Sequence, residues 1–439
     1  MSGGGNNATI SFPGPEWVMR WPYGFDNFQL DIVGFLAILG EGSVAANAQV
    51  AALSRLFYLP RLIPAPQALL WPNRPVTLDP TKATVMAVYS GNSKDHVHHV
   101  AHVLLGDEMP TFMVRCVEVR KKTERRTATR MDTFFRGQPV RAKTQSPMFD
   151  PPSVKAKATG PLAWVTLLGF SLSVSLFTLS IAFGDGMSLL ATILLSLLST
   201  LVGMGNKWSL KLPRRPQDSK PPAGDVVIRY PNGSYLVVKC DEDVARELYF
   251  APEEIDYNIK SPAYYRLISL VGTLMLMLGV ICLANARLQL QFAWAGAYIL
   301  INIAQWTAAA LPARLHWDLS CYDVKEQSVV GGPKCPTFTE ALWKAIMLTK
   351  STRWVKDGKA APRTEVWDAW LVEALEKAQA VQKSKTDILL DPQWPKKKGA
   401  RGIVWEDPDE WQPKEAWNQL NEEFSEAARN NAMHPTTAA

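Results

Sequence analysis

The sequence predicts a membrane protein that is mainly α-helical, with four transmembrane helices in two hairpins and with α+β cytoplasmic regions. Four long uncharged apolar runs carry this prediction, because about 20 apolar residues in a helix cross the hydrocarbon core of a bilayer. The runs are 162–183, 186–205, 267–286 and 292–311. The rest of the 439-residue chain is polar enough that 20% of all residues are charged. This composition argues against a purely soluble enzyme and against a compact transporter buried mostly in lipid.

Two short connections pair the apolar runs. Gly184 and Asp185 join the first pair, and Arg287–Gln291 joins the second pair. We therefore expect two antiparallel helical hairpins whose short loops lie on the same side of the membrane. The segment 120–157, before the first run, holds eleven Lys or Arg against three acids. Lys and Arg are enriched on the cytoplasmic side of membrane proteins. Both termini and the segment 206–266 are therefore expected in the cytoplasm, at a membrane whose organelle the sequence does not identify.

The N-terminal region, 1–119, is expected to be a cytoplasmic α+β region, followed by a basic linker, 120–161. Phe28–Tyr58 is apolar with few charges and indicates packed helices. A re-entrant segment at Ile32–Gly40 is the alternative, since that run is too short to cross. Further along, the patterns predict two strands and one helix: Thr84–Tyr89, Thr111–Val119 and, as the helix, Asp95–Leu105.

The middle segment, 206–266, is predicted to be a cytoplasmic ββα insert. Asp225–Tyr230 and Ser234–Cys240 are rich in β-branched residues, and Asn232-Gly233 between them is a strong hairpin signal. A two-residue loop there places Tyr230 opposite Tyr235 and Ile228 opposite Val237. Asp241 is expected at the N-cap of the following helix. A unit of this size does not bury enough surface to fold alone, so we expect it to pack on a terminal region.

The C-terminal region, 312–439, is predicted to be a Trp-rich helical cytoplasmic tail. Nine of the sixteen tryptophans lie in it. Thr337 and Glu340 form a capping box, Val366–Ala378 has helical spacing, and Pro413 suits a helix start. We interpret the tryptophans as core, with docking of a protein partner or a second copy as the alternative. Nineteen acids against eighteen basic residues make a nucleic-acid partner unexpected.

Membrane lipids are the partner that the basic linker indicates. Lys121, Lys122, Arg125 and Arg126 lie in the most basic part of the linker and are candidates for contact with anionic lipid headgroups. A solvated linker without lipid contact is the alternative.

Polar residues lie in or beside the apolar runs: Asn302 and Gln305 in the fourth, Asn285 near the end of the third, and Ser171, Ser173 and Ser175 in the first. Polar groups in lipid usually form hydrogen bonds between helices, so we expect them to hold the bundle together. A substrate path is the alternative, although the runs contain no ionisable residue of the kind that marks such paths.

Signals for catalysis and cofactors are weak. His98 and His102 are spaced to share one face of a helix, and His99 is adjacent, but the Glu of the zincin motif HEXXH is missing. We therefore predict a polar helix face, with a metal site as the alternative. The five cysteines are scattered and form no CxxC pair. No phosphate-binding loop or nucleophile elbow occurs, so we expect no catalytic residue and no cofactor.

Three stretches carry a resemblance. They are NGSYLVVKCDEDVARELYF (232–250), YYRLISLVGTLMLMLGVICLANA (264–286) and ALPARLHWDLSCYDV (310–324). Over about 160–325 the chain resembles large multi-pass membrane proteins of filamentous fungi that have no assigned biochemical activity. The resemblance implies the same four-span plan, with a hairpin domain between the span pairs, and it brings no catalytic residues.

These observations favour a membrane-anchored scaffold or interaction protein that is not an enzyme. A small oligomeric transporter or channel subunit is the first alternative, because four helices rarely enclose a path alone. A membrane-bound enzyme that uses the His96–His102 cluster is the second. Bound zinc would favour the enzyme, and ionisable side chains in a cavity among the spans would favour the transporter.

Overall fold

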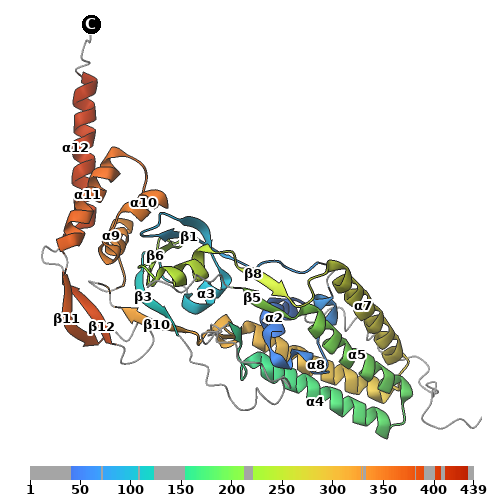
Figure 1. The fold of residues 1–439 in the computed structure, drawn as a ribbon. Coiled ribbons are helices and arrows are strands. Elements are labelled where there is room, and N and C mark those ends of the chain that lie inside the picture. Colours follow the sequence, from blue (N-terminus) through green and yellow to red (C-terminus); the bar gives the residue numbers. More distant parts are fainter. Residues whose placement is uncertain are drawn as a thin grey trace, which may run out of the picture. The chain divides into compact units, whose positions relative to one another are not determined.

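The computed structural model describes two compact units (Figure 1). The described residues are 41–70, 73–106, 109–122, 154–211, 221–327, 329, 333–380, 382–389, 401–406 and 411–433. The first unit, here called the helical unit, comprises the described residues within 41–76, 154–210 and 255–318. The second, the sheet unit, comprises those within 77–122, 211–254 and 319–433. Each unit draws on three stretches of chain, so neither is one continuous segment.

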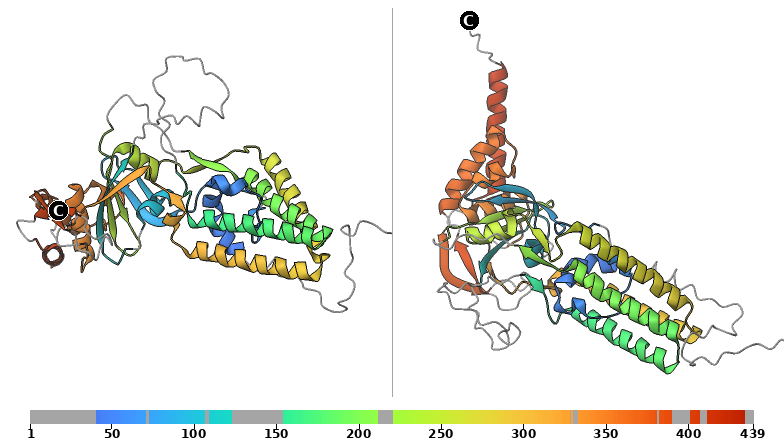
Figure 2. Two further views of the ribbon diagram at one scale, coloured as in Figure 1. Left: turned by 90° about the horizontal axis from the view of Figure 1, so that it is seen from below. Right: turned by 45° about the vertical axis from the view of Figure 1, so that its right-hand side comes forward.

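Four long helices form the frame of the helical unit. They are α4 (Pro161–Ala182), α5 (Gly186–Asn206), α7 (Pro262–Ala284) and α8 (Leu288–Ala310). The described chain contains three helices long and apolar enough to cross a membrane, α4, α5 and α7. α8 covers the fourth apolar run but is not among them, because its Gln and Asn side chains lower its hydropathy. α5 packs along α7, and α4 packs along α5 and α8 (Figure 2).

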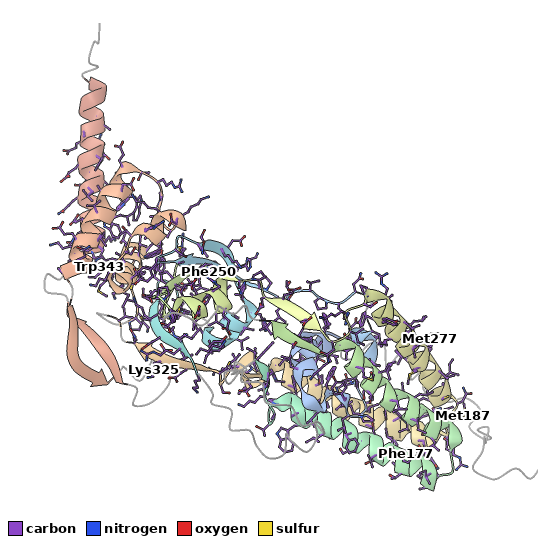
Figure 3. The ribbon with its side chains drawn as sticks, viewed as in Figure 1. Phe177, Met187, Phe250, Met277, Lys325 and Trp343 are labelled. Carbon is purple, nitrogen blue, oxygen red and sulfur yellow. The ribbon has the colours of Figure 1, made fainter. Side chains whose placement is uncertain are left out.

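The outward surface of these helices is apolar. Phe177 on α4 and Met277 on α7 are labelled in Figure 3, and both side chains are exposed. Ile181, Leu274 and Ile303 are likewise exposed. In a soluble protein a surface of this kind would be costly to hydrate, whereas lipid tails solvate it well.

The two short connections between the helices touch each other. Gly184 has φ 62°, which lets the chain turn after α4, and Asp185 caps α5 by accepting from the N–H of Met187 at 3.0 Å. The other carboxylate oxygen of Asp185 accepts from the N–H of Arg287 at 2.7 Å. The guanidinium of Arg287 donates to the carbonyl of Phe183 at 2.6 Å. The loops that the sequence places on one side of the membrane are thus bonded together.

Short elements complete the helical unit. Helix α2 and the 3-10 turns η1 and η2 pack among the long helices, and two small strand pairs adjoin them. Their bounds are α2 Glu41–Leu53, η1 Arg55–Tyr58, η2 Pro66–Leu69, β4 Lys155–Ala156 with β9 Trp317–Asp318, β5 Trp208–Lys211 with β8 Glu254–Tyr257, and η4 Ala313–Leu315. The expected re-entrant run Ile32–Gly40 lies outside the described residues.

A six-stranded sheet forms the centre of the sheet unit, in the order β10-β3-β7-β6-β1-β2. Only the β3–β7 pair is parallel. The strands are β1 Thr81–Ala87, β2 Ser93–Val97, β3 Val114–Lys121, β6 Val226–Arg229, β7 Tyr235–Lys239 and β10 Tyr322–Gln327. The ββα insert therefore does not fold alone, as expected: its hairpin β6–β7 lies between β1 and β3.

Helices flank this sheet and complete its core. Helix α9 (Phe338–Thr349) packs on β7 and β3, and α10 (Arg353–Asp357) packs on β1. Helices α11 (Glu365–Ala380) and α12 (Pro413–Met433) pack on α9. The remaining helical elements are α3 His99–Leu105, α6 Glu242–Ala245 and the π-helical turn η3 Arg246–Phe250.

The tryptophans of the tail are mainly core, as the helical spacing predicts. Trp343, Trp354 and Trp370 are buried, and Trp367 and Trp417 pack against them. The N-cap half of the expected capping box is confirmed, because the Thr337 hydroxyl accepts from the N–H of Glu340. The tail is not wholly helical, however. It also contains the hairpin β11 (Gln382–Leu389) with β12 (Arg401–Glu406) and the edge strand β10.

The register of the β6–β7 hairpin differs from the expected one. Ile228 pairs with Leu236 and Arg229 with Tyr235, so the prediction of Tyr230 opposite Tyr235 and of Ile228 opposite Val237 is wrong by one residue. The loop has three residues, because the N–H of Tyr230 donates to the carbonyl of Ser234 at 3.0 Å. Gly233 at φ 78° supplies the left-handed residue that such a loop requires.

The expected helix Asp95–Leu105 also begins later than predicted. Ser93–Val97 forms β2 instead, and only His99–Leu105 is helical. The alternation of exposed and half-buried residues along Ser93–His96 fits an edge strand beside β1, and tertiary pairing overrides the weak helical pattern. His98 is consequently the N-cap of α3 and not a residue within the helix.

Candidate functional site

The histidine cluster does not form a metal site in the described part of the chain, where no group of three or more His, Cys, Asp or Glu is placed to hold an ion. His98 Nε2 lies 3.2 Å from the ammonium of Lys94, and His99 Nδ1 lies 3.3 Å from the carbonyl of Asp79. Burial lowers the pKa of His98 to about 4, helped by the nearby charges of Lys94 and His96. Burial also lowers the pKa values of His99 and His102. The buried histidines are therefore neutral at physiological pH.

The basic linker is described only at its start. Lys121 lies in β3, and its ammonium is 2.5 Å from the carboxylate of Glu247, which also accepts from the hydroxyl of Tyr322 at 2.6 Å. Lys122 follows the strand and is exposed. Arg125 and Arg126 lie outside the described residues. Lys121 thus neutralises a buried carboxylate in the sheet unit, and contact of the four residues with lipid stays a prediction.

Asn285, Asn302 and Gln305 do not form hydrogen bonds from one long helix to another. The amides of Asn285 and Asn302 donate to their own helices, at the carbonyls of Ile281 and Tyr298. The amide of Gln305 donates to the carbonyl of Ser43 on α2 at 3.3 Å. Other side chains bond the long helices together: Gln291 on α8 donates to the carbonyl of Ala284 on α7 at 3.0 Å, and serines join α4 to α5. Ser180 meets Ser188 at 2.8 Å, and Ser196 donates to Ser173 at 3.0 Å, both between α4 and α5.

The most unusual part of the helical unit is a segment without α-helix, Ser54–Leu70, which contains the 3-10 turns η1 and η2 and packs among the long helices. We call it the inserted segment. The N–H of Leu62 donates to the carbonyl of Gly169 within α4 at 3.1 Å. The N–H of Ala65 donates to the hydroxyl of Tyr298 on α8 at 2.6 Å. The segment therefore reaches positions well inside α4 and α8.

Two glycines make room for this segment. A Cβ on Gly169 would lie 2.6 Å from the carbonyl oxygen of Leu62, and one on Gly203 would lie 2.7 Å from that of Phe57. Any side chain at either glycine would force the backbones apart. The sequence carried a signal here that the analysis of apolar runs missed. Pro60 and Pro64 interrupt helix formation in an apolar stretch, and Gly169 and Gly203 occupy predicted spans.

Arg61 is the buried charged residue of the inserted segment and is 7% exposed. Its guanidinium donates to the carbonyls of Phe57 at 2.9 Å and Leu59 at 3.4 Å, at the end of η1. Among the described residues no carboxylate pairs with it. Together with Thr166 and Gln305, it lines a cavity of about 40 Å³ among α2, α4 and α8. Sequence reasoning did not identify this residue.

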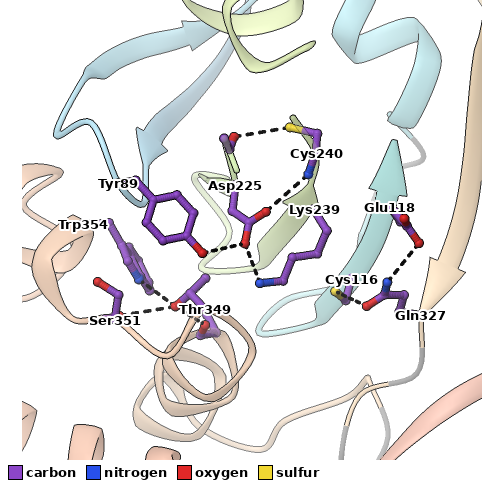
Figure 4. Close-up of polar contacts among 12 residues, drawn as sticks. Tyr89, Cys116, Glu118, Asp225, Lys239, Cys240, Gln327, Thr349, Ser351 and Trp354 are labelled. Carbon is purple, nitrogen blue, oxygen red and sulfur yellow. Dashed lines mark hydrogen bonds and ion pairs between the residues drawn. The ribbon is translucent and has the colours of Figure 1, made fainter. Parts of the chain in front are cut away.

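The sheet unit contains a second buried polar network, centred on Asp225 (Figure 4). Its carboxylate accepts from the ammonium of Lys239 at 2.6 Å, the hydroxyl of Tyr89 at 3.3 Å and the N–H of Cys240 at 3.3 Å. Burial, followed by the charge of Asp225, raises the pKa of the Cys240 thiol. The thiol donates to the carbonyl of Gly224. A protonated, hydrogen-bonded thiol is a poor nucleophile, so this network holds strand ends together.

Comparison with protein families, curated proteins and solved structures found no match for this chain.

Removing the hydroxyl that anchors the inserted segment should destabilise the helical unit. Ser199 on α5 is fully buried; it accepts from the N–H of Arg61 at 2.9 Å and donates to the carbonyl of Leu59 at 3.0 Å. Ser199→Ala should cost about 1–3 kcal/mol, because buried backbone groups lose their partner. Thermal unfolding of the purified protein in detergent measures this.

The matched control is Ser175→Ala on α4, whose exposed hydroxyl donates to the carbonyl of Ser171 in its own helix. This change should alter stability by no more than about 0.5 kcal/mol. Equal losses in both variants would contradict the anchoring role.

The neutral state of His98 should make the sheet unit sensitive to acid. The folded-state pKa of about 4 lies below the value near 6.5 of an unfolded histidine. As pH falls below 6.5 the unfolded chain binds the proton first, so the protein should lose up to about 3 kcal/mol by pH 4. His98→Asn, which can also cap α3, should show a flatter curve of unfolding free energy between these pH values. Parallel curves for the two proteins would refute this assignment.

Proposed function

We propose that the chain is a multi-pass integral membrane protein that crosses the bilayer with α4, α5, α7 and α8 and holds the sheet unit as a membrane-anchored interaction scaffold. The three helices long and apolar enough to cross a membrane support the anchoring role. Large apolar side chains on their outward faces suit contact with lipid.

The observation that carries the four-span plan is the connection between the helices and the sheet. β3 and β6 are strands of one sheet, and the chain between them contains α4 and α5. β7 and β10 belong to the same sheet, and the chain between them contains α7 and α8. A chain that leaves and re-enters one soluble sheet must cross the membrane an even number of times. If α7 crosses, α8 is the helix available for the return.

The same argument supports a position of the sheet unit on one side of the membrane, and the charge distribution favours the cytoplasmic side. Basic residues flank the ends of the long helices that connect to the sheet unit, including Lys155, Lys157, Lys207 and Arg314. The connections at the other end carry one cation, Arg287. This distribution matches the enrichment of positive residues in cytoplasmic segments.

The Arg61 cavity favours a second candidate function, an oligomeric transporter or channel subunit for small anions. A buried guanidinium among apolar helices attracts anions, and inserted non-helical segments line ion paths in other membrane proteins. The histidine cluster gives no comparable support to an enzyme, because within the described residues it belongs to no group of three or more His, Cys, Asp or Glu that could hold a metal ion.

Glycosylation tests the topology. The sequons at Asn7 and Asn232 both lie in segments assigned to the cytoplasm, and Asn232 itself is exposed. Neither asparagine should carry a glycan in a eukaryotic host, since glycans are added only on the lumenal side. As a positive control, a sequon inserted in a linker between Gly184 and Asp185 should be glycosylated. A glycosidase-sensitive mass shift that Asn232→Gln abolishes would reverse the proposed orientation.

An anion-flux assay tests the second candidate. If Arg61 forms part of an anion path, proteoliposomes should release iodide, and Arg61→Met should abolish the flux by removing the charge. Arg61→Lys should keep measurable flux because it retains a cation. Absence of flux from the parent protein, or equal flux from the parent and from Arg61→Met, would eliminate this candidate.

A further inference from the structure

A pocket of about 690 Å³ lies in the sheet unit and belongs to neither site discussed above. Arg229, at the end of β6, and Phe338, at the start of α9, form one part of its wall. The chain between α10 and α11, 359–363, forms another, together with Trp367 in the first turns of α11. A volume of this size falls within the range of small-molecule sites.

The pocket is positively charged. Arg229, Lys359 and Arg363 all line it, and no carboxylate residue does. Within the described chain none of the three forms an ion pair, whereas the neighbouring Arg353 and Lys356 are paired with acids. Arg229 donates to the carbonyl of Lys359 at 3.3 Å. The pocket is shallow and open to solvent, and three such cations gathered there attract anions.

Lys359 occupies a backbone position that usually belongs to glycine. It has φ 51° and follows the end of α10, where the N–H of Ala360 donates to the carbonyl of Val355 at 2.9 Å. Helices commonly end with a left-handed glycine at this place, because a side chain there is strained. The lysine adds a cation to the pocket at a position where glycine would fold more easily.

Aromatic rings form the apolar part of the wall. The centroids of Phe338 and Trp367 are 6.3 Å apart, and the guanidinium of Arg229 lies 5.5 Å from the Phe338 centroid. Trp367 is backed by Trp370 at 5.4 Å and Trp417 at 5.8 Å. The rings are therefore held in place and offer surface to a flat apolar group.

We propose that this pocket binds a nucleoside phosphate, with its phosphates near Arg229, Lys359 and Arg363 and its base against Phe338 and Trp367. Bases stack on aromatic side chains, and phosphates are recognised by Arg and Lys. An apolar ligand would leave the three cations without an anionic partner, and inorganic phosphate would leave the two rings without a stacking partner. The volume suits a mononucleotide better than a peptide of several residues. This inference goes beyond the scaffold role and does not depend on the number of spans.

Calorimetric titration of the full-length protein in detergent, with ATP and pyrophosphate as probes, tests the proposal. ATP should bind, and more tightly than pyrophosphate, because only ATP can contact the rings. Lys359→Gly should weaken binding of both probes about five- to tenfold by removing one close charge. It should not lower the unfolding temperature, since glycine relieves the strain at this position.

Two further variants separate ring contact from charge. Phe338→Leu should weaken ATP binding and leave pyrophosphate binding unchanged. Lys356→Ala is the matched control, because it removes an exposed lysine of α10 that lies outside the pocket lining and is paired with Asp368. It should leave ATP binding unchanged.

Three results would overturn the proposal. The first is no heat of binding with millimolar ATP, and the second is equal loss of ATP binding in Lys356→Ala and Lys359→Gly. The third is tighter binding of a phosphotyrosine peptide than of ATP, which would assign the pocket to a protein partner. None of these results bears on the glycosylation test, so failure of this inference is distinguishable from failure of the proposed topology.

Discussion

The helical unit depends on one requirement, that the backbone of the inserted segment finds hydrogen-bond partners among apolar helices. Non-helical backbone is tolerated at membrane depth only where protein groups satisfy it. Ser199, Thr200 and Tyr298 supply side-chain partners to Arg61, Tyr58 and Ala65. Asn206 donates to the carbonyl of Leu69, and Lys207 donates to those of Leu53 and Ser54. These polar side chains on the long helices therefore serve as hydrogen-bond partners for the backbone of the inserted segment.

The same requirement explains how a charged residue is retained there. Three carbonyls near the end of η1 accept from the Arg61 guanidinium, and cations are stabilised at such helix ends. In this arrangement the hydrogen bonds of the Arg61 side chain remain within the inserted segment. The adjoining cavity of about 40 Å³ holds little more than one water molecule. Passage of an anion would therefore require the inserted segment to move. In the observed arrangement Arg61 has a structural role, and a role in transport would need a different arrangement.

The sequence predicted what depends on local composition and missed what depends on distant pairing. Apolar runs located the long helices, and the capping residues located the start of α9 at Phe338. The hairpin was found, but its register was not, because Pro231 joins the loop and Gly233 takes the left-handed position. The partners of the inserted segment are more than 100 residues apart in the chain, as are Arg61 and Ser199, and no local pattern reports such a pair. The cationic pocket likewise combines Arg229 with a distant loop.

The order of elements also couples the two units during folding. The sheet needs β1 to β3, then β6 and β7, and finally β10, and a pair of long helices is synthesised between each group. The parallel β3–β7 pair cannot form until α4 and α5 have been made, and β10 can join β3 only after α7 and α8. Non-local pairing of this kind carries a loop-closure cost before contacts offset it. In a membrane, a helix pair returns the chain to the side on which it started. The strands before and after the pair then remain close to each other, which reduces the cost of loop closure. Insertion of the helices and completion of the sheet would then be steps of one process.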